Sequence, residues 1–147
     1  MMGRYAIVAV GVAGVLGIGF WWTGPTGDAV APAADGTAQA AAPMVDVLVP
    51  EALSANAEIG KLAYDAKCAA CHGANAAGQD GVAPPLVHKI YEPSHHGDAA
   101  FLLAAKNGVR AHHWRFGNMP PVEGVTDGDV KMIVAFVREL QRANGIN

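Results

Sequence analysis

The longest apolar stretch of the chain covers residues 5–22 and contains no charged residue. At a rise of 1.5 Å per helical residue, about eighteen residues extend roughly 27 Å, which just spans a bilayer core. The stretch ends in three bulky aromatics, Phe20 to Trp22, and the nearest small-residue cleavage site, Ala29 to Ala31, lies well beyond it. This pattern predicts an uncleaved transmembrane anchor over 5–22, with a removed secretory signal peptide as the alternative.

The basic residues predict the orientation of this anchor. Arg4 precedes the apolar stretch, and no further Lys or Arg follows until Lys61. Because basic residues stay on the cytoplasmic side, we expect residues 1–4 in the cytoplasm and the remainder of the chain to be exported, into a bacterial periplasm.

Residues 23–55 are rich in Ala, Pro, Gly and acids and show no sustained apolar period. Such a composition buries too little surface to offset the entropy of ordering it, so we expect a flexible linker with a short ordered piece around Val45 to Val49. Its root-mean-square span of roughly 30 Å would let an exported domain, residues 56–147, move between partners or hold that domain clear of the lipid.

Helical periodicity dominates residues 56–147. An amphipathic first helix is expected to begin at Ala57 and to run into the segment 68–72. Its apolar stripe consists of Ile59, Leu62 and Ala66. A second set of residues recurs every four positions: Gly60, Tyr64 and Cys68.

Two later helices have recognisable ends. Asp98 is expected to cap a short helix over 99–107 that Gly108 ends. Thr126 and Asp129 form a capping-box-like start for the last helix, and Gly145 suits its end. The apolar positions of this last helix are Val130, Ile133, Val134, Val137 and Leu140.

Residues 68–72 read Cys-Ala-Ala-Cys-His and use the only two cysteines of the chain. Two thiols three positions apart on a helical turn can each add to a vinyl group on one edge of a porphyrin, and the adjacent imidazole can reach the iron. The motif is typical of c-type haem attachment. It predicts that Cys68 and Cys71 hold one haem c covalently and that His72 is an axial iron ligand.

Other interpretations of these cysteines meet specific objections. A thiol-disulfide centre expects a βαβ surround, whereas the periodicity here is helical. A zinc site would need two of the remaining histidines, and no second pair among them has finger-like spacing. A disulfide between Cys68 and Cys71 would close a loop too short to constrain the unfolded chain.

Charge narrows the class of partner. Residues 56–147 hold nine acidic and nine basic side chains, so the domain is formally neutral. It lacks the one-sign field that steers a protein towards nucleic acid, and we expect no such partner.

Residues 56–147 resemble the class I cytochromes c. The resemblance rests on the attachment motif, on Gly60 and Tyr64 ahead of it, and on Phe136 in the last helix, where the family's first and last helices cross closely. It implies the all-α class I cytochrome c fold, a small helical domain wrapped around one covalent haem.

The resemblance also implies a second axial ligand. The loop from Arg115 to Pro121 is similar to the family's G-x-M-P segment, which makes Met119 the distal ligand. The alternatives are His112, His113 or an open position.

Further pocket residues follow from the same resemblance. Residues 78–86 are similar to the segment whose proline carbonyl, here that of Pro84, orients the axial histidine, although Ala83 replaces the usual glycine. Leu86 would line the pocket. Candidate hydrogen-bond donors to the haem propionates are Trp114, Arg110 and Arg115. The pairs His95-His96 and His112-His113 lie in polar turns and are expected to be exposed.

Together these features predict a membrane-tethered carrier of single electrons, not an enzyme, and no small-molecule substrate. Its partners would be membrane redox complexes of a respiratory or photosynthetic chain, one a donor and one an acceptor. The alternatives are a tightly bound haem subunit of a larger membrane oxidoreductase, or a haem peroxidase or gas sensor with a vacant sixth position.

Overall fold

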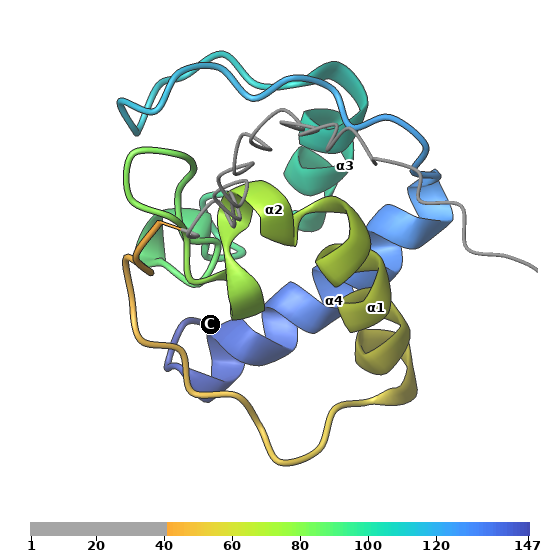
Figure 1. The fold of residues 1–147 in the computed structure, drawn as a ribbon. Coiled ribbons are helices and arrows are strands. Elements are labelled where there is room, and N and C mark those ends of the chain that lie inside the picture. Colours follow the sequence, from red (N-terminus) through yellow and green to blue (C-terminus); the bar gives the residue numbers. More distant parts are fainter. Residues whose placement is uncertain (1–40) are drawn as a thin grey trace, which may run out of the picture. The chain divides into compact units, whose positions relative to one another are not determined.

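Helices make up the regular structure of residues 41–147, the part of the chain that the computed structural model describes (Figure 1). No strand element occurs within this part, which confirms the prediction of an all-α domain. The predicted cytoplasmic end, the anchor and linker residues 23–40 lie outside the described residues. None of the helices within 41–147 has the length and apolar character needed to cross a membrane. The elements in chain order are α1 (Ala55–Lys67), α2 (Ala69–His72), η1 (Ala74–Ala76), η2 (Lys89–Tyr91), α3 (Asp98–Asn107) and α4 (Asp127–Ala143).

The first and last helices cross in direct contact (Figure 1). A Cβ atom added to Gly60 of α1 would lie 1.9 Å from the backbone oxygen of Met132 in α4, so only glycine permits this approach. One turn further along, the rings of Tyr64 and Phe136 pack with centroids 5.5 Å apart. These contacts form the centre of a core to which both helices contribute.

The prediction that Ile59, Leu62 and Ala66 form the apolar face of α1 towards the core is wrong. Ile59 is 55% exposed and Leu62 is 73% exposed, and Ala66 is also on the surface. The column that faces inward is the other one, with Gly60 and Tyr64 buried. The close crossing explains the difference, because backbone contact at Gly60 fixes which side of α1 meets α4.

The ends of α4 follow the predicted chemistry. The Thr126 hydroxyl accepts a hydrogen bond from the Asp129 backbone, and the Asp129 carboxylate accepts one from the Thr126 backbone, a complete capping box. At the other end, Gly145 adopts φ 75°, and Ile146 N–H donates to Gln141 at 2.9 Å. The predicted apolar positions of α4 are all buried.

Helix α3 ends at Gly108 as predicted, but Asp98 does not cap it. Gly97 occupies the N-cap position, and Asp98 is the first helical residue. The Asp98 carboxylate instead accepts a hydrogen bond from Nε of Arg138 at 2.9 Å. A long-range partner on α4 therefore competes successfully with the local cap.

The described end of the predicted linker packs on the domain. The backbone N–H groups of Met44 and Val45 both donate to the carbonyl of Ala77, at 3.1 and 3.2 Å. Leu48 exchanges two hydrogen bonds with the Asn144 side chain, both at 2.9 Å. Val47 lies against the core. The ordered piece expected around Val45 to Val49 is present, and the flexible linker does not extend to residue 55 because these residues find acceptors and apolar neighbours.

Candidate functional site

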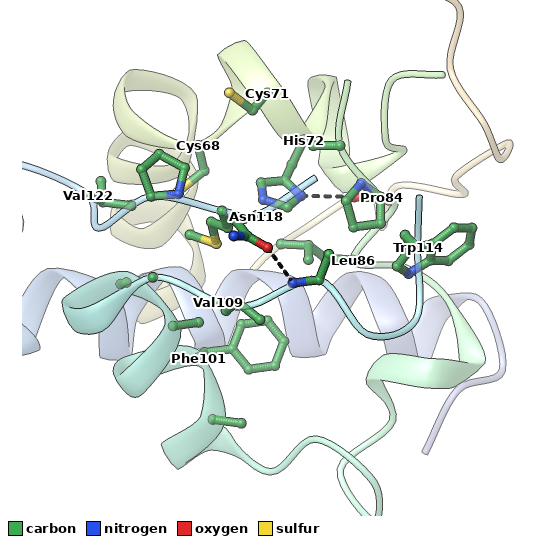
Figure 2. Close-up of a pocket in the computed structure, with 18 of the residues that line it drawn as sticks. Cys68, Cys71, His72, Pro84, Leu86, Phe101, Val109, Trp114, Asn118 and Val122 are labelled. Atoms are coloured by element: carbon green, nitrogen blue, oxygen red, sulfur yellow. Dashed lines mark hydrogen bonds between the residues drawn. The ribbon is translucent and has the colours of Figure 1, made fainter. Parts of the chain in front are cut away.

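A cavity of about 460 Å³ opens between α2, α3, the start of α4 and the loop that joins α3 to α4 (Figure 2). Its lining is mainly apolar, with Leu86, Phe101 and Val109 among the residues drawn. The volume lies in the range of sites that bind cofactors and other small molecules. The two cysteines and His72 border it.

One thiol lies just before the short helix α2, and the other lies within it. Cys68 is the N-cap of α2 and is half-buried, whereas Cys71 is exposed, and both are free. Burial, with a smaller contribution from Cys71, raises the pKa of the Cys68 thiol to about 11. Redox-active C-x-x-C sites need a lowered thiol pKa, so this environment does not suit a thiol-disulfide centre.

His72 is held with one nitrogen available. Its Nδ1 lies 2.8 Å from the carbonyl oxygen of Pro84 (Figure 2). Because a carbonyl can only accept, Nδ1 carries the proton and Nε2 keeps a free lone pair. Burial lowers the pKa of His72, and the Pro84 hydrogen bond offsets this in part. The ring is therefore neutral near pH 7, which is the form that binds metals.

Gln79 secures the attachment helix, a role that sequence reasoning missed. Its buried side-chain amide donates to the carbonyl oxygens of Ala70 at 2.7 Å and Cys71 at 3.1 Å. These carbonyls belong to the last turn of α2 and have no partner inside so short a helix. A polar residue in a Gly-rich loop gave no signal of this contact.

The loop carrying Met119 is folded back on itself. Val109 and Met119 exchange backbone hydrogen bonds of 2.9 and 3.0 Å, and the Asn118 side chain accepts from the Ala111 backbone at 2.9 Å. A Cβ atom on Gly108 would lie 2.5 Å from the Met119 oxygen. These contacts fix the backbone of Met119, which is one of the residues that line the cavity.

His112 and His113, the alternatives to Met119 as the second axial ligand, lie in a group of histidines. Nδ1 of His112 lies 2.8 Å from the carbonyl oxygen of Arg110. The ring of His113 lies next to those of His95 and His96, with centroids 5.2 and 5.3 Å away. His112 and His113 also border the cavity, but their neighbours are these other histidines.

Trp114 has an unsatisfied donor at the cavity. Its indole Nε1 is buried and has no hydrogen-bond partner among the described residues. Burial raises the pKa of the nearby Tyr91 phenol, and the Trp114 indole lowers it by a smaller amount. The indole N–H nevertheless does not meet hydrogen-bond geometry with the Tyr91 hydroxyl. A buried donor of this kind needs an acceptor, and a cofactor carboxylate would provide one.

Arg110 and Arg115 stay predictions as propionate donors. Both are exposed, and neither is part of the cavity lining. Their neighbours Val109, Ala111 and Trp114 do line it.

Arg138 holds the loop that precedes α3. Its guanidinium is buried and donates to the carbonyl oxygens of Tyr91 at 2.7 Å and His96 at 2.6 Å, and to the Gln141 side chain. Gln141 in turn donates to the carbonyl of Leu86 at 2.8 Å. Sequence reasoning missed Arg138 and Gln141. Their positions continue the helical spacing of the buried residues Val134 and Val137, which could have indicated that both are buried.

The donor set fits the porphyrin that the attachment motif predicts. Two thiols, an oriented imidazole and a thioether border one apolar cavity, and the orphaned Trp114 N–H lies at the same cavity. Thioether and imidazole are the axial ligands that stabilise haem iron in electron carriers. The residues present therefore suit a haem.

The comparisons agree with this chemistry. The family model described as Cytochrome c matches residues 57–141 of the chain. No curated protein and no solved structure matched. The match covers more than half of the chain and all of the residues that border the cavity, so this chain belongs to the cytochrome c family, whose haem domain transfers electrons.

Proposed function

We propose that this protein is a membrane-tethered monohaem cytochrome that carries single electrons between membrane redox complexes on the periplasmic side. Cys68 and Cys71 attach the haem covalently, and His72 and Met119 ligate its iron. The observation that carries the proposal is the 2.8 Å contact between His72 Nδ1 and Pro84 O, which leaves Nε2 of His72 unprotonated beside two free thiols.

Each part of the cavity has a separate task in this proposal. Haem, when bound, supplies a one-electron iron couple. Pro84 fixes the tautomer and ring orientation of His72. The Val109–Met119 pairing holds the thioether in place, and the apolar walls exclude water. The Trp114 indole donates to a propionate.

Met119 is the better candidate than His112 or His113 for the distal position. The rings of His112 and His113 lie 4.3 Å apart, and they adjoin the rings of His95 and His96. Thioether ligation also raises the reduction potential relative to a second imidazole. If His72 and Met119 both ligated the iron, no position would remain for a substrate, which is the arrangement of a carrier rather than of a peroxidase or gas sensor.

Electron exchange would take place where the cavity opens to the surface. Cys71 is exposed, and the exposed apolar side chains of Val82 and Leu103 line the cavity. An apolar rim formed by these side chains suits the brief contacts of small buried area that redox partners make.

The first test is the intact mass and the absorption spectrum of the full chain, matured in cells that assemble c-type cytochromes. We expect the mass of one covalent haem and an absorption band near the red edge that reports iron–methionine coordination. Met119→Ala should lose that band while keeping the haem. Met132→Leu, a matched change on α4, should keep both.

Two results would contradict the proposal. A colourless protein would exclude haem attachment, and a red-edge band that persists in Met119→Ala would exclude Met119 as the ligand. The same mass spectrum decides whether residues 1–31 are retained. Recovery of the holoprotein alone from mild detergent supports a mobile carrier, and co-purification with an oxidoreductase supports a fixed subunit.

A further inference from the structure

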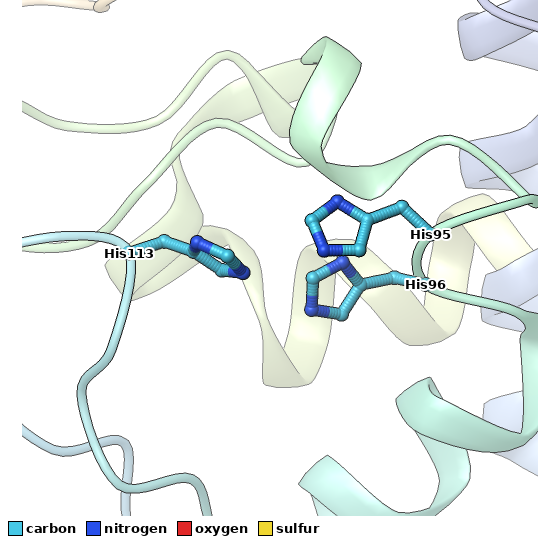
Figure 3. A group of neighbouring side chains, drawn as sticks. All are labelled: His95, His96 and His113. Atoms are coloured by element: carbon cyan, nitrogen blue, oxygen red, sulfur yellow. The ribbon is translucent and has the colours of Figure 1, made fainter.

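Three histidine rings from two separate loops converge beside the cavity (Figure 3). His95 and His96 precede α3, and His113 belongs to the loop between α3 and α4. One ring nitrogen from each lies within 4.8 Å of the others. The three ring centroids are 4.6 to 5.3 Å apart.

His96 is oriented as metal ligands usually are. Its Nδ1 lies 2.6 Å from the carbonyl oxygen of Ile90, so Nδ1 carries the proton and the lone pair of Nε2 is free. A hydrogen bond from the second ring nitrogen to a carbonyl is the usual support of a metal-bound histidine. No hydrogen bond to the described residues occupies the rings of His95 and His113.

The backbone behind these rings is fixed. The buried Arg138 donates to the carbonyl oxygen of His96 at 2.6 Å and to that of Tyr91 at 2.7 Å. Both loops are therefore anchored, the first by Arg138 and the second by the Val109–Met119 pairing. A site supported in this way binds without the cost of ordering its loops.

The surroundings of His113 favour its neutral ring. Desolvation, followed by the neighbouring His112, His96 and His95, lowers the pKa of His113. A protonated imidazole cannot bind a metal ion, so the neutral form of His113 is the one that a cation requires.

We propose that His95, His96 and His113 bind a divalent transition-metal ion of the class that prefers imidazole, with Cu²⁺ bound more tightly than Ni²⁺ or Zn²⁺. Three nitrogen donors suit these ions, whereas Mg²⁺ and Ca²⁺ require oxygen ligands. The order of affinity follows the Irving–Williams series.

The geometry needs only a small adjustment. Metal–nitrogen bonds of about 2.0–2.1 Å place the nitrogens of a tetrahedral site about 3.3 Å apart. The nitrogens now lie within 4.8 Å, and His95 and His113 are exposed, so their rings are free to rotate inward while His96 stays fixed. Three protein ligands leave a fourth position for water.

His112 lies just outside this triad and supplies a matched control. Its Nδ1 contacts the carbonyl oxygen of Arg110 at 2.8 Å, and its ring centroid lies 4.3 Å from that of His113 and 6.0 Å from that of His96. Its ring nitrogens are not part of the group that converges within 4.8 Å. Replacing His112 alters the same loop and the same residue type without removing a proposed ligand.

The test is calorimetric titration of the haem-loaded full chain, without a polyhistidine tag, with Cu²⁺, Ni²⁺ and Zn²⁺ in turn. We expect one ion per chain and the tightest binding for Cu²⁺, with nitrogen couplings in the Cu²⁺ electron paramagnetic resonance spectrum. His95→Gln and His113→Gln should each weaken binding by about tenfold or more. His112→Gln should leave the affinity within about twofold of the unchanged chain.

The inference fails if no ion binds, if binding is unchanged in His95→Gln and His113→Gln, or if His112→Gln weakens it equally. Unchanged haem absorption in the three variants shows that each is folded. None of the three histidines is a proposed iron ligand, so a negative titration leaves the haem assignment intact.

Discussion

Gly60 of α1 and Met132 of α4 are in backbone contact, since a Cβ atom on Gly60 would lie 1.9 Å from the Met132 oxygen and 2.4 Å from its carbonyl carbon. This contact sets the separation of the two helices. Because α2 follows α1 almost directly, it also sets where Cys68 and His72 meet the cavity.

Gly60→Ala should therefore destabilise the domain by at least about 2 kcal/mol, because the added methyl group forces the two backbones apart. Chemical denaturation gives the free energy of unfolding. Gly128→Ala is the matched control in α4, where the nearest atom to a new Cβ is the Thr126 hydroxyl at 3.5 Å. There the better helix propensity of alanine should leave stability unchanged or raise it by up to about 1 kcal/mol. Equal effects of both substitutions would disprove the close-contact explanation.

Gln79→Met should weaken the attachment helix at nearly constant side-chain volume. It removes the donor to the Ala70 and Cys71 carbonyl oxygens and leaves them unsatisfied beside the cavity, at a cost of about 1–3 kcal/mol. We expect a lower unfolding free energy and a lower yield of haem-bearing protein. Asp80→Asn, at the exposed neighbouring position, should change neither quantity.

Arg138→Lys should be costly although it keeps the charge. The guanidinium reaches two backbone carbonyls, Gln141 and Asp98, a planar arrangement that one ammonium group cannot reproduce. We expect a loss of about 3 kcal/mol in the free energy of unfolding. Asp98→Asn should cost less than about 1 kcal/mol, because the Asp98 side chain is 69% exposed. A small effect of Arg138→Lys would show that the loop before α3 is held by other contacts.

The capping box of α4 should make stability depend on pH. Hydrogen bonds from the Thr126 backbone and side chain lower the pKa of Asp129 below its ordinary value of 3.8. The unfolded chain then binds a proton more readily than the folded one, so this contribution is complete above about pH 5 and is lost as the pH falls through the folded pKa. Denaturation of Asp129→Asn, compared with the unchanged chain between about pH 6 and pH 3, should show a difference that shrinks on acidification. A constant difference would rule out the carboxylate as its source.

The sequence by itself determined the features that depend on neighbours along the chain. The attachment motif, the capping box of Thr126 and Asp129, the helix end at Gly108 and the buried face of α4 are all local, because each is set by residues within one or two helical turns. The family resemblance also pointed to Gly60, Phe136 and Pro84. These residues contact Met132, Tyr64 and His72 respectively, in agreement with the resemblance.

Periodicity did not decide which face of α1 is buried, and only the tertiary structure decided which residue Asp98 binds and where residues 41–54 lie. Each of these depends on a partner far away in the chain, on α4 or beside Ala77. It also decided that His95, His96 and His113 meet. Periodicity describes one segment at a time, whereas burial and convergence are properties of segments in contact, and here contact at a single glycine selected the buried face.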